Sequence, residues 1–121
     1  MPNVRSMQND TSLPLAVNVV GQSPHVFAYR FWAKEPGAAD WTVIGDGQTE
    51  DEVPDSFLTG PHPDGTRIAY WTGVGGKRNS DFRLAVTFSQ QDRIIVGGLD
   101  VVLGRTSDLG GGVAEKEAIL I

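Results

Sequence analysis

The chain has 121 residues, of which 40% are hydrophobic and 21% charged, and its formal net charge is −5. This size and composition indicate a single globular domain, and the acidic balance argues against a nucleic-acid binder, which usually carries a basic patch. The absence of cysteine excludes disulfides and thiolate metal sites, and no apolar run approaches the roughly 18 residues that a membrane-inserted segment needs.

Residues 1–12 carry few apolar side chains, and we expect a flexible N-terminal arm ahead of a single β-sandwich domain over residues 13–121. The arm lacks the apolar core of a secretory signal, which favours a cytoplasmic protein or one released without a cleavable signal. From Leu15 to Val20 the apolar residues alternate, which predicts a strand with one buried face that ends at the turn residues 21–24.

The segment from Val26 to Ala33 gives the strongest strand signal in the chain. Successive side chains of a strand point to opposite faces, so Phe27, Tyr29 and Phe31 share one face and Trp32 lies on the other. Two interpretations of Trp32 remain open. It points outward if the phenylalanine face is the core, and it is itself core if both faces are covered or the register is reversed.

Turns and short strands follow this segment. The turn residues 34–40 separate it from a short strand over residues 41–44, so the two strands are expected to form a hairpin. Residues 45–54 are predicted as an acidic loop and residues 56–59 as a short edge strand. Two prolines and two glycines then make residues 60–65 a loop.

Carboxylates gather around the acidic loop, where they suggest a calcium site. Calcium takes six to eight oxygen ligands at about 2.3–2.6 Å, and clustered loop carboxylates can supply them. The candidate ligands are Asp46, Glu50, Asp51 and Asp55. The alternative is a solvated acidic loop that keeps the molecule soluble, and the sequence suggests no other cofactor.

Residues 66–72 and 82–89 look like a second long hairpin, joined by a glycine-containing connection. Their shared period of two predicts one core between the two hairpins, made of Phe27, Tyr29, Phe31, Leu84, Val86 and Phe88. Two further short strands, over residues 93–96 and 99–103, continue the pattern across a Gly-Gly pair. A glycine-rich link then leads to a last strand over residues 115–121, which ends on three apolar side chains. This tip either closes the sheet of its own domain or adds to the edge of a neighbour, which would make a homo-oligomer.

No long helical periodicity is present, and seven to nine short strands predict an all-β, antiparallel β-sandwich of jelly-roll or immunoglobulin-like type. The segments FAYRFWAKEPGAADWTVI, PDGTRIAYW and DFRLAVTF resemble the middle of a bacterial immunoglobulin-like or fibronectin-like sandwich domain. That resemblance implies that Tyr70 forms a tyrosine corner, although Tyr70 follows Asp64 by six residues and the family's cysteine pair is missing. It implies a fold and no catalytic residue, because sandwich domains host unrelated functions.

The residues favour a non-catalytic binding module, and carbohydrate recognition by a lectin-like sandwich is its sharpest form. The candidate ligand contacts are Trp32, Trp71, Asn79 and Asp81. A protein partner and a structural subunit of a larger particle or appendage are the alternatives. A small hydrolase that uses loop carboxylates is the second alternative. The two histidines lie beside prolines in predicted turns, without a nucleophile motif, and we expect them to be solvated loop side chains.

Overall fold

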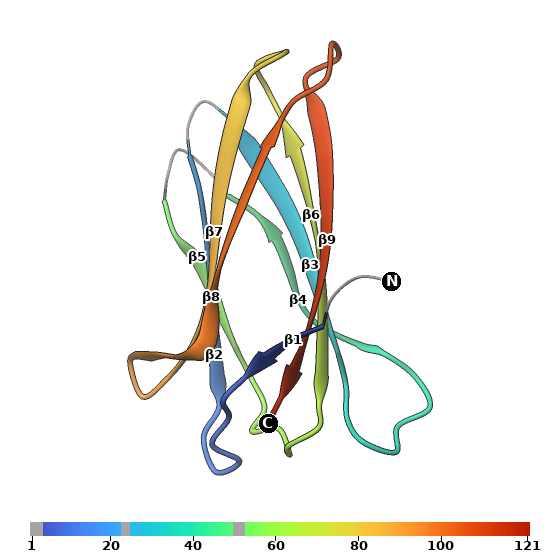
Figure 1. Cartoon of the computed structure of the whole chain (residues 1–121), viewed down its shortest axis with the longest axis vertical. Helices are drawn as coiled ribbons and strands as arrows, with labels where there is room; N and C mark the ends of the chain where they lie inside the picture. Colours follow the sequence, from blue (N-terminus) through green and yellow to red (C-terminus); the bar gives the residue numbers. More distant parts are fainter. Residues whose placement is uncertain (1–3, 23–24, 50–52) are drawn as a thin grey trace.

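In the computed structural model, which describes residues 4–22, 25–49 and 53–121, nine strands form two packed sheets (Figure 1). The strands are β1 (Val4–Met7), β2 (Leu15–Gly21), β3 (Val26–Lys34), β4 (Thr42–Gln48), β5 (Asp55–Thr59), β6 (Arg67–Gly75), β7 (Asp81–Gln90), β8 (Arg93–Arg105) and β9 (Gly111–Leu120). Sheet A has the order β1-β9-β6-β3-β4 and sheet B the order β5-β2-β7-β8. All pairs are antiparallel except β1 with β9, so the predicted all-β sandwich is confirmed.

The hydrophobic core lies between the two sheets and follows the alternation seen in the sequence. Phe31 stacks on Tyr70 of its own sheet, with ring centroids 4.8 Å apart, and meets Phe88 of sheet B edge-on at 6.1 Å. The six side chains predicted to share the core are all buried there: Phe27, Tyr29, Phe31, Leu84, Val86 and Phe88. The phenylalanine face of β3 is therefore the inner face of sheet A.

The predicted hairpin of residues 66–72 with residues 82–89 is wrong. β6 pairs with β3 and β9 in sheet A, whereas β7 pairs with β2 and β8 in sheet B. The connection crosses from one sheet to the other, and Tyr70 and Phe88 face each other across the core at 5.8 Å. Alternation indicates which face of a strand is buried, but it does not indicate in which sheet the strand lies.

The first part of the predicted acidic loop is strand, because β4 continues to Gln48. Its glycines mark places where other side chains come close. A Cβ added at Gly45 would lie 2.7 Å from the ring of Phe57, and one at Gly47 would lie 2.7 Å from the hydroxyl of Tyr29. Glycine in a strand can mark such a close approach as well as a turn.

The expected N-terminal arm differs from the structure over its described part, since Val4–Met7 forms β1 beside β9. Met7 is fully buried, and the backbone of Gln8 donates to Val96 of β8 at 2.9 Å. The arm was expected because a strand of this length shows too little alternation to be recognised. Residues 1–3 lie outside the described part of the chain.

The C-terminal segment pairs within its own chain, where β9 lies between β6 and β1 (Figure 1). Ala118 and Leu120 are fully buried in the core. Of the two outcomes expected for this tip, closure of its own sheet is the one observed, so the tip needs no neighbour to satisfy its backbone.

Two tyrosine–aspartate pairs join the sheets. Tyr70 of β6 donates to Asp100 of β8 at 2.5 Å, and Arg5 of β1 lies 3.5 Å from the same carboxylate. Tyr29 of β3 donates to Asp55 of β5. The tyrosine-corner interpretation of Tyr70 is therefore wrong, because its hydroxyl donates to a carboxylate of the other sheet and not to nearby backbone.

Candidate functional site

The outer face of sheet A carries the most distinctive group of side chains in the described chain. The strand register places Arg30 of β3 between Asp46 of β4 and Trp71 of β6, in one row across the sheet. In the next row Trp32 lies opposite Ala69. Trp32 and Trp71 are thus diagonal neighbours, and we call this surface the tryptophan face.

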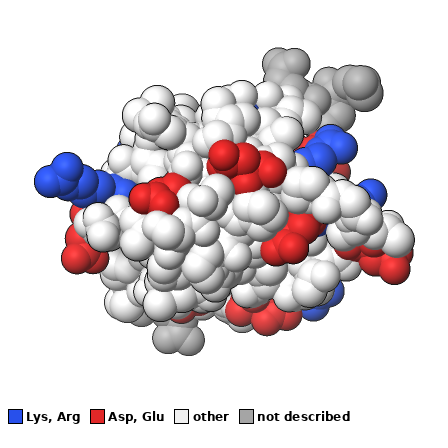
Figure 2. Space-filling view, turned by 90° about the horizontal axis from the view of Figure 1, so that it is seen from below, with Lys and Arg blue, Asp and Glu red and all other residues white. Residues whose placement is uncertain are grey.

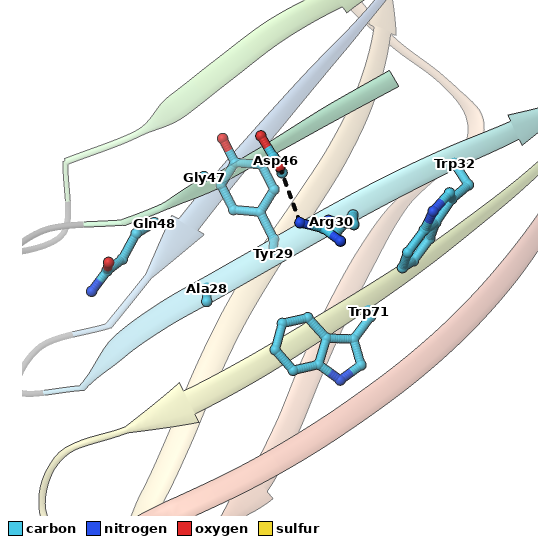
Figure 3. A pocket seen from close by; sticks show the side chains of 8 residues that line it. All are labelled: Ala28, Tyr29, Arg30, Trp32, Asp46, Gly47, Gln48 and Trp71. Carbon is cyan, nitrogen blue, oxygen red and sulfur yellow. Dashed lines mark hydrogen bonds and ion pairs between the residues drawn. The ribbon is translucent and has the colours of Figure 1, made fainter. Parts of the chain in front are cut away.

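Trp32 points outward, which resolves the alternative that the sequence left open. Both Trp32 and Trp71 are partly exposed, while the residues that flank them along each strand are buried. In Figure 3 the indole of Trp71 is seen face-on and that of Trp32 nearly edge-on. The planes of the two rings are therefore turned relative to each other.

The flat position of Trp71 depends on Gly73, two residues further along β6. A Cβ at Gly73 would lie 2.6 Å from Cη2 and 2.8 Å from Cζ2 of Trp71, closer than carbon atoms pack. The indole therefore occupies the space that a side chain at this outward position would fill.

Charged and amide side chains surround the two indoles. Arg30 lies 3.4 Å from Asp46, and both side chains are about half exposed, at 53% and 58%. On the β9 side, Glu117 pairs with Arg67 at 2.5 Å. The exposed Arg30–Asp46 pair adds little to stability, so its groups can form hydrogen bonds with a ligand at small cost, whereas the Glu117 side chain is only 16% exposed.

Two hollows meet at the tryptophans. The one toward β4, of about 650 Å³, is lined by Ala28, Tyr29, Arg30, Trp32, Asp46, Gly47, Gln48 and Trp71 (Figure 3). The one toward β9, of about 510 Å³, is lined by Trp32, Ala69, Tyr70, Trp71, Glu115, Lys116 and Glu117. Trp32 and Trp71 line both, so the indoles form a ridge between two shallow depressions.

Asn79 and Asp81 lie away from this ridge, at the end of the molecule where β6 leads into β7. Asn79 adopts a left-handed backbone conformation with φ of 49° in the connection, and Asp81 lies 3.3 Å from Arg105. Neither residue lines either hollow beside the tryptophans. Their part in ligand binding stays a prediction, and the structure does not bring them to the Trp32–Trp71 pair.

The candidate calcium ligands are separated where they can be described. Asp46 faces Arg30 on the outer side of sheet A, whereas Asp55 accepts the hydroxyl of Tyr29 at the edge of sheet B. Glu50 and Asp51 lie outside the described residues. Within residues 4–22, 25–49 and 53–121, no group of three or more His, Cys, Asp or Glu is placed to hold a metal ion, and calcium binding stays a prediction.

The two histidines are buried, which corrects the expectation of solvated loop side chains. The His62 ring lies 2.9 Å from Thr59 Oγ1 and 3.4 Å from Glu35 Oε1. His25 lies 2.8 Å from Ser80 Oγ. The hydroxyl–imidazole–carboxylate series around His62 ties the 60–65 loop to β5 and to the β3–β4 connection.

Charges elsewhere are dispersed. Seen from below, the surface carries scattered carboxylates, with basic side chains near the rim (Figure 2). The described part of the chain contains no helix of a length and apolarity that would cross a membrane. Comparison with protein-family models, with curated proteins and with solved structures finds no match for this chain.

Sequence reasoning identified Trp32 and Trp71 but missed the residues around them. Arg30 shares the outward phase of β3 with Trp32, and Gly73 shares that of β6 with Trp71, so alternation alone could have placed both on this face. Asp46 and Glu115 reach the face from other strands. Their position depends on the register between strands, which a single sequence does not give.

Proposed function

We propose that the chain is a non-catalytic, lectin-like module that binds carbohydrate on the tryptophan face. The observation that supports this is the pair of partly exposed indoles, Trp32 and Trp71, on a sheet face that carries polar side chains beside them and exposed valines around them: Val26, Val43 and Val113. Large aromatic side chains are normally placed in the core, as Phe27, Phe31 and Phe88 are, so two indoles that lie next to each other on an outer face support a binding surface.

The chemistry of a pyranose suits this arrangement. The C–H groups on one face of the sugar pack against the electron-rich face of an indole, while its hydroxyls point sideways. Arg30 and Gln48 offer donors beside the ridge, and Asp46 offers acceptors. A few polar groups around an aromatic surface are the usual composition of a small-molecule site.

The test is a glycan array, followed by calorimetry on the best ligand. Trp71→Ala and Trp32→Ala should each weaken binding by about 30-fold, the loss of about 2 kcal/mol expected for an aromatic anchor. Trp41→Ala is the matched control, since Trp41 is 40% exposed but lies before β4 and lines neither hollow. Equal binding by all three variants would contradict the proposal, as would a wild-type chain that binds no glycan.

Assembly with a second copy, as in a structural subunit, is the other candidate, and the outer face of sheet B favours it. β8 is the last strand of sheet B, and its outward Leu99 and Leu103 are 54% and 70% exposed. Antiparallel pairing of this edge with the same edge of a second chain would satisfy its backbone groups and place the leucines of the two chains side by side across a two-fold interface.

Light scattering tests this second candidate. We expect a dimer for the wild type and a monomer for Leu103→Asp, while Leu109→Asp, in the turn before β9, keeps the dimer. A monomeric wild type at high concentration removes the candidate. The carbohydrate proposal does not depend on it, because the tryptophan face belongs to sheet A.

A further inference from the structure

We infer that the tryptophan face binds internal units of an uncharged polysaccharide chain, with Trp71 as the stacking surface and Gly73 as the residue that positions its indole. The inference depends on the proposed function and adds to it the class of ligand, the part of the ligand that is recognised and the residue that shapes the site.

The site is an open surface on one face of a sheet, and its lining residues do not form a wall at either end. Its lining residues come from adjacent strands of one sheet, β4, β3, β6 and β9, and the side chains of Arg30, Trp32 and Trp71 project from its outer face. A site that selects a chain end needs a wall to close around the terminal unit. Here the hollows on the two sides of the tryptophan ridge leave room for further units on both sides of the one that stacks on Trp71.

The charges around the ridge argue for a neutral ligand. Two cationic side chains, Arg30 and Arg67, project from the outer face beside the ridge, and three carboxylate residues line the hollows. Those carboxylates belong to Asp46, Glu115 and Glu117. Arg30 is already paired with Asp46 and Arg67 with Glu117, so a polysaccharide rich in uronate or sulfate would meet more repulsion than attraction. Hydroxyl groups can use both signs of charge as hydrogen-bond partners.

Gly73 is assigned a positioning role by its contact with the indole. A methyl group at this position would enter the space now occupied by Cη2 and Cζ2 of Trp71 and would lift the ring from the sheet. Gly73 has no left-handed backbone angle, so alanine suits the strand, and the substitution changes the ring position without removing the ring. At Gly75, on the same side of β6, an added Cβ would meet nothing within 4 Å.

The ligand class is tested by calorimetry with neutral hexaoses (β-1,4-glucan, β-1,4-mannan and β-1,4-xylan), their monosaccharides, borohydride-reduced hexaoses and polygalacturonate. We expect one hexaose to bind at least about tenfold more tightly than its monosaccharide, a difference of 1.4 kcal/mol, and its reduced form to bind equally well. Binding of polygalacturonate alone, or loss of binding on reduction, overturns the inference while the carbohydrate proposal stands. Failure of all sugars, here and on the array, overturns both.

The positioning role is tested with Gly73→Ala against Gly75→Ala. Gly73→Ala should weaken hexaose binding by about tenfold and change the near-ultraviolet circular dichroism of the tryptophans, with an unchanged midpoint of urea unfolding. Gly75→Ala should retain binding and spectrum. If Trp71→Ala abolishes binding but Gly73→Ala does not weaken it, the assignment of Gly73 is wrong although the site is right.

Discussion

At the residue scale, Phe31 is a core side chain that contacts aromatic rings of both sheets. It is fully buried, stacks on Tyr70 and meets Phe57 edge-on at 5.4 Å and Phe88 at 6.1 Å. Its ring therefore joins sheet A to both β5 and β7 of sheet B. Removing it would leave a cavity that four other rings line, since Tyr29 also lies against it, and rings held by strands on both sides cannot collapse fully into it.

Phe31→Ala should reduce the free energy of unfolding by about 3–5 kcal/mol, because the loss of buried surface and the cavity both contribute. Urea denaturation followed by tryptophan fluorescence measures this as a lower midpoint. Leu109→Ala is the control, since Leu109 is 93% exposed and the change should stay within about 0.5 kcal/mol. An unchanged midpoint for Phe31→Ala would mean that the register of β3 is not the one described.

At the scale of elements, the two tyrosine–aspartate pairs connect strands of opposite sheets, β3 with β5 and β6 with β8. Burial raises the pKa of Tyr70, and its hydrogen bond to Asp100 raises it further, although Arg5 acts in the opposite direction. Burial and the hydrogen bond to Asp55 likewise raise the pKa of Tyr29. Both hydroxyls thus keep their protons in the folded chain to a higher pH than in the unfolded one.

The sign of the resulting pH dependence follows from proton binding. Below the unfolded tyrosine pKa of about 10, both states are protonated and the contribution to stability is complete. Above it the unfolded chain loses protons that the folded chain retains, so we expect the free energy of unfolding to fall as the pH rises beyond about 10. Urea midpoints between pH 8 and pH 11.5 measure this fall.

The double variant Tyr29→Phe with Tyr70→Phe separates the contribution of these two tyrosines to the alkaline loss of stability from that of other groups that titrate at high pH. It should be less stable than the wild type near pH 8, because Asp55 and Asp100 lose a hydrogen-bond donor, and its midpoint should depend less steeply on pH. A parallel fall of wild type and double variant would assign the alkaline effect to other residues.

The alternation of apolar and polar residues predicts some of these strands and misses others. The strands of residues 26–33 and 82–89 and the core side chains of each were predicted correctly, because a period of two marks a half-buried strand. β1 was missed because it is short and mostly polar, and the end of β4 because Gly45 and Gly47 resemble turn residues. Pairing partners depend on contacts between distant segments, which is why β6 and β7 were wrongly joined.

At the scale of the whole molecule, the site was only half predictable for the same reason. Trp32 and Trp71 are conspicuous in the sequence, but their meeting on one face requires that β3 and β6 be neighbours in a fixed register. The flat position of Trp71 over Gly73 is a local feature of one strand, yet its meaning appears only once that face is known to be outward.

The parallel pairing of β1 with β9 also determines how the fold would respond to mechanical tension. The pairing joins Val4 to Glu117 and Met7 to Leu120, so a pull on the start of β1 and the end of β9 drags the two strands past each other lengthwise. Under such shear all of their hydrogen bonds bear the load together, whereas a strand peeled from its end breaks them one at a time. Arg5 adds a cross-link to Gly97 of β8 at 2.8 Å, next to the same seam. We therefore expect this sandwich to withstand a stretching force along its own chain better than its thermodynamic stability alone implies, because forced unfolding depends on the unfolding barrier.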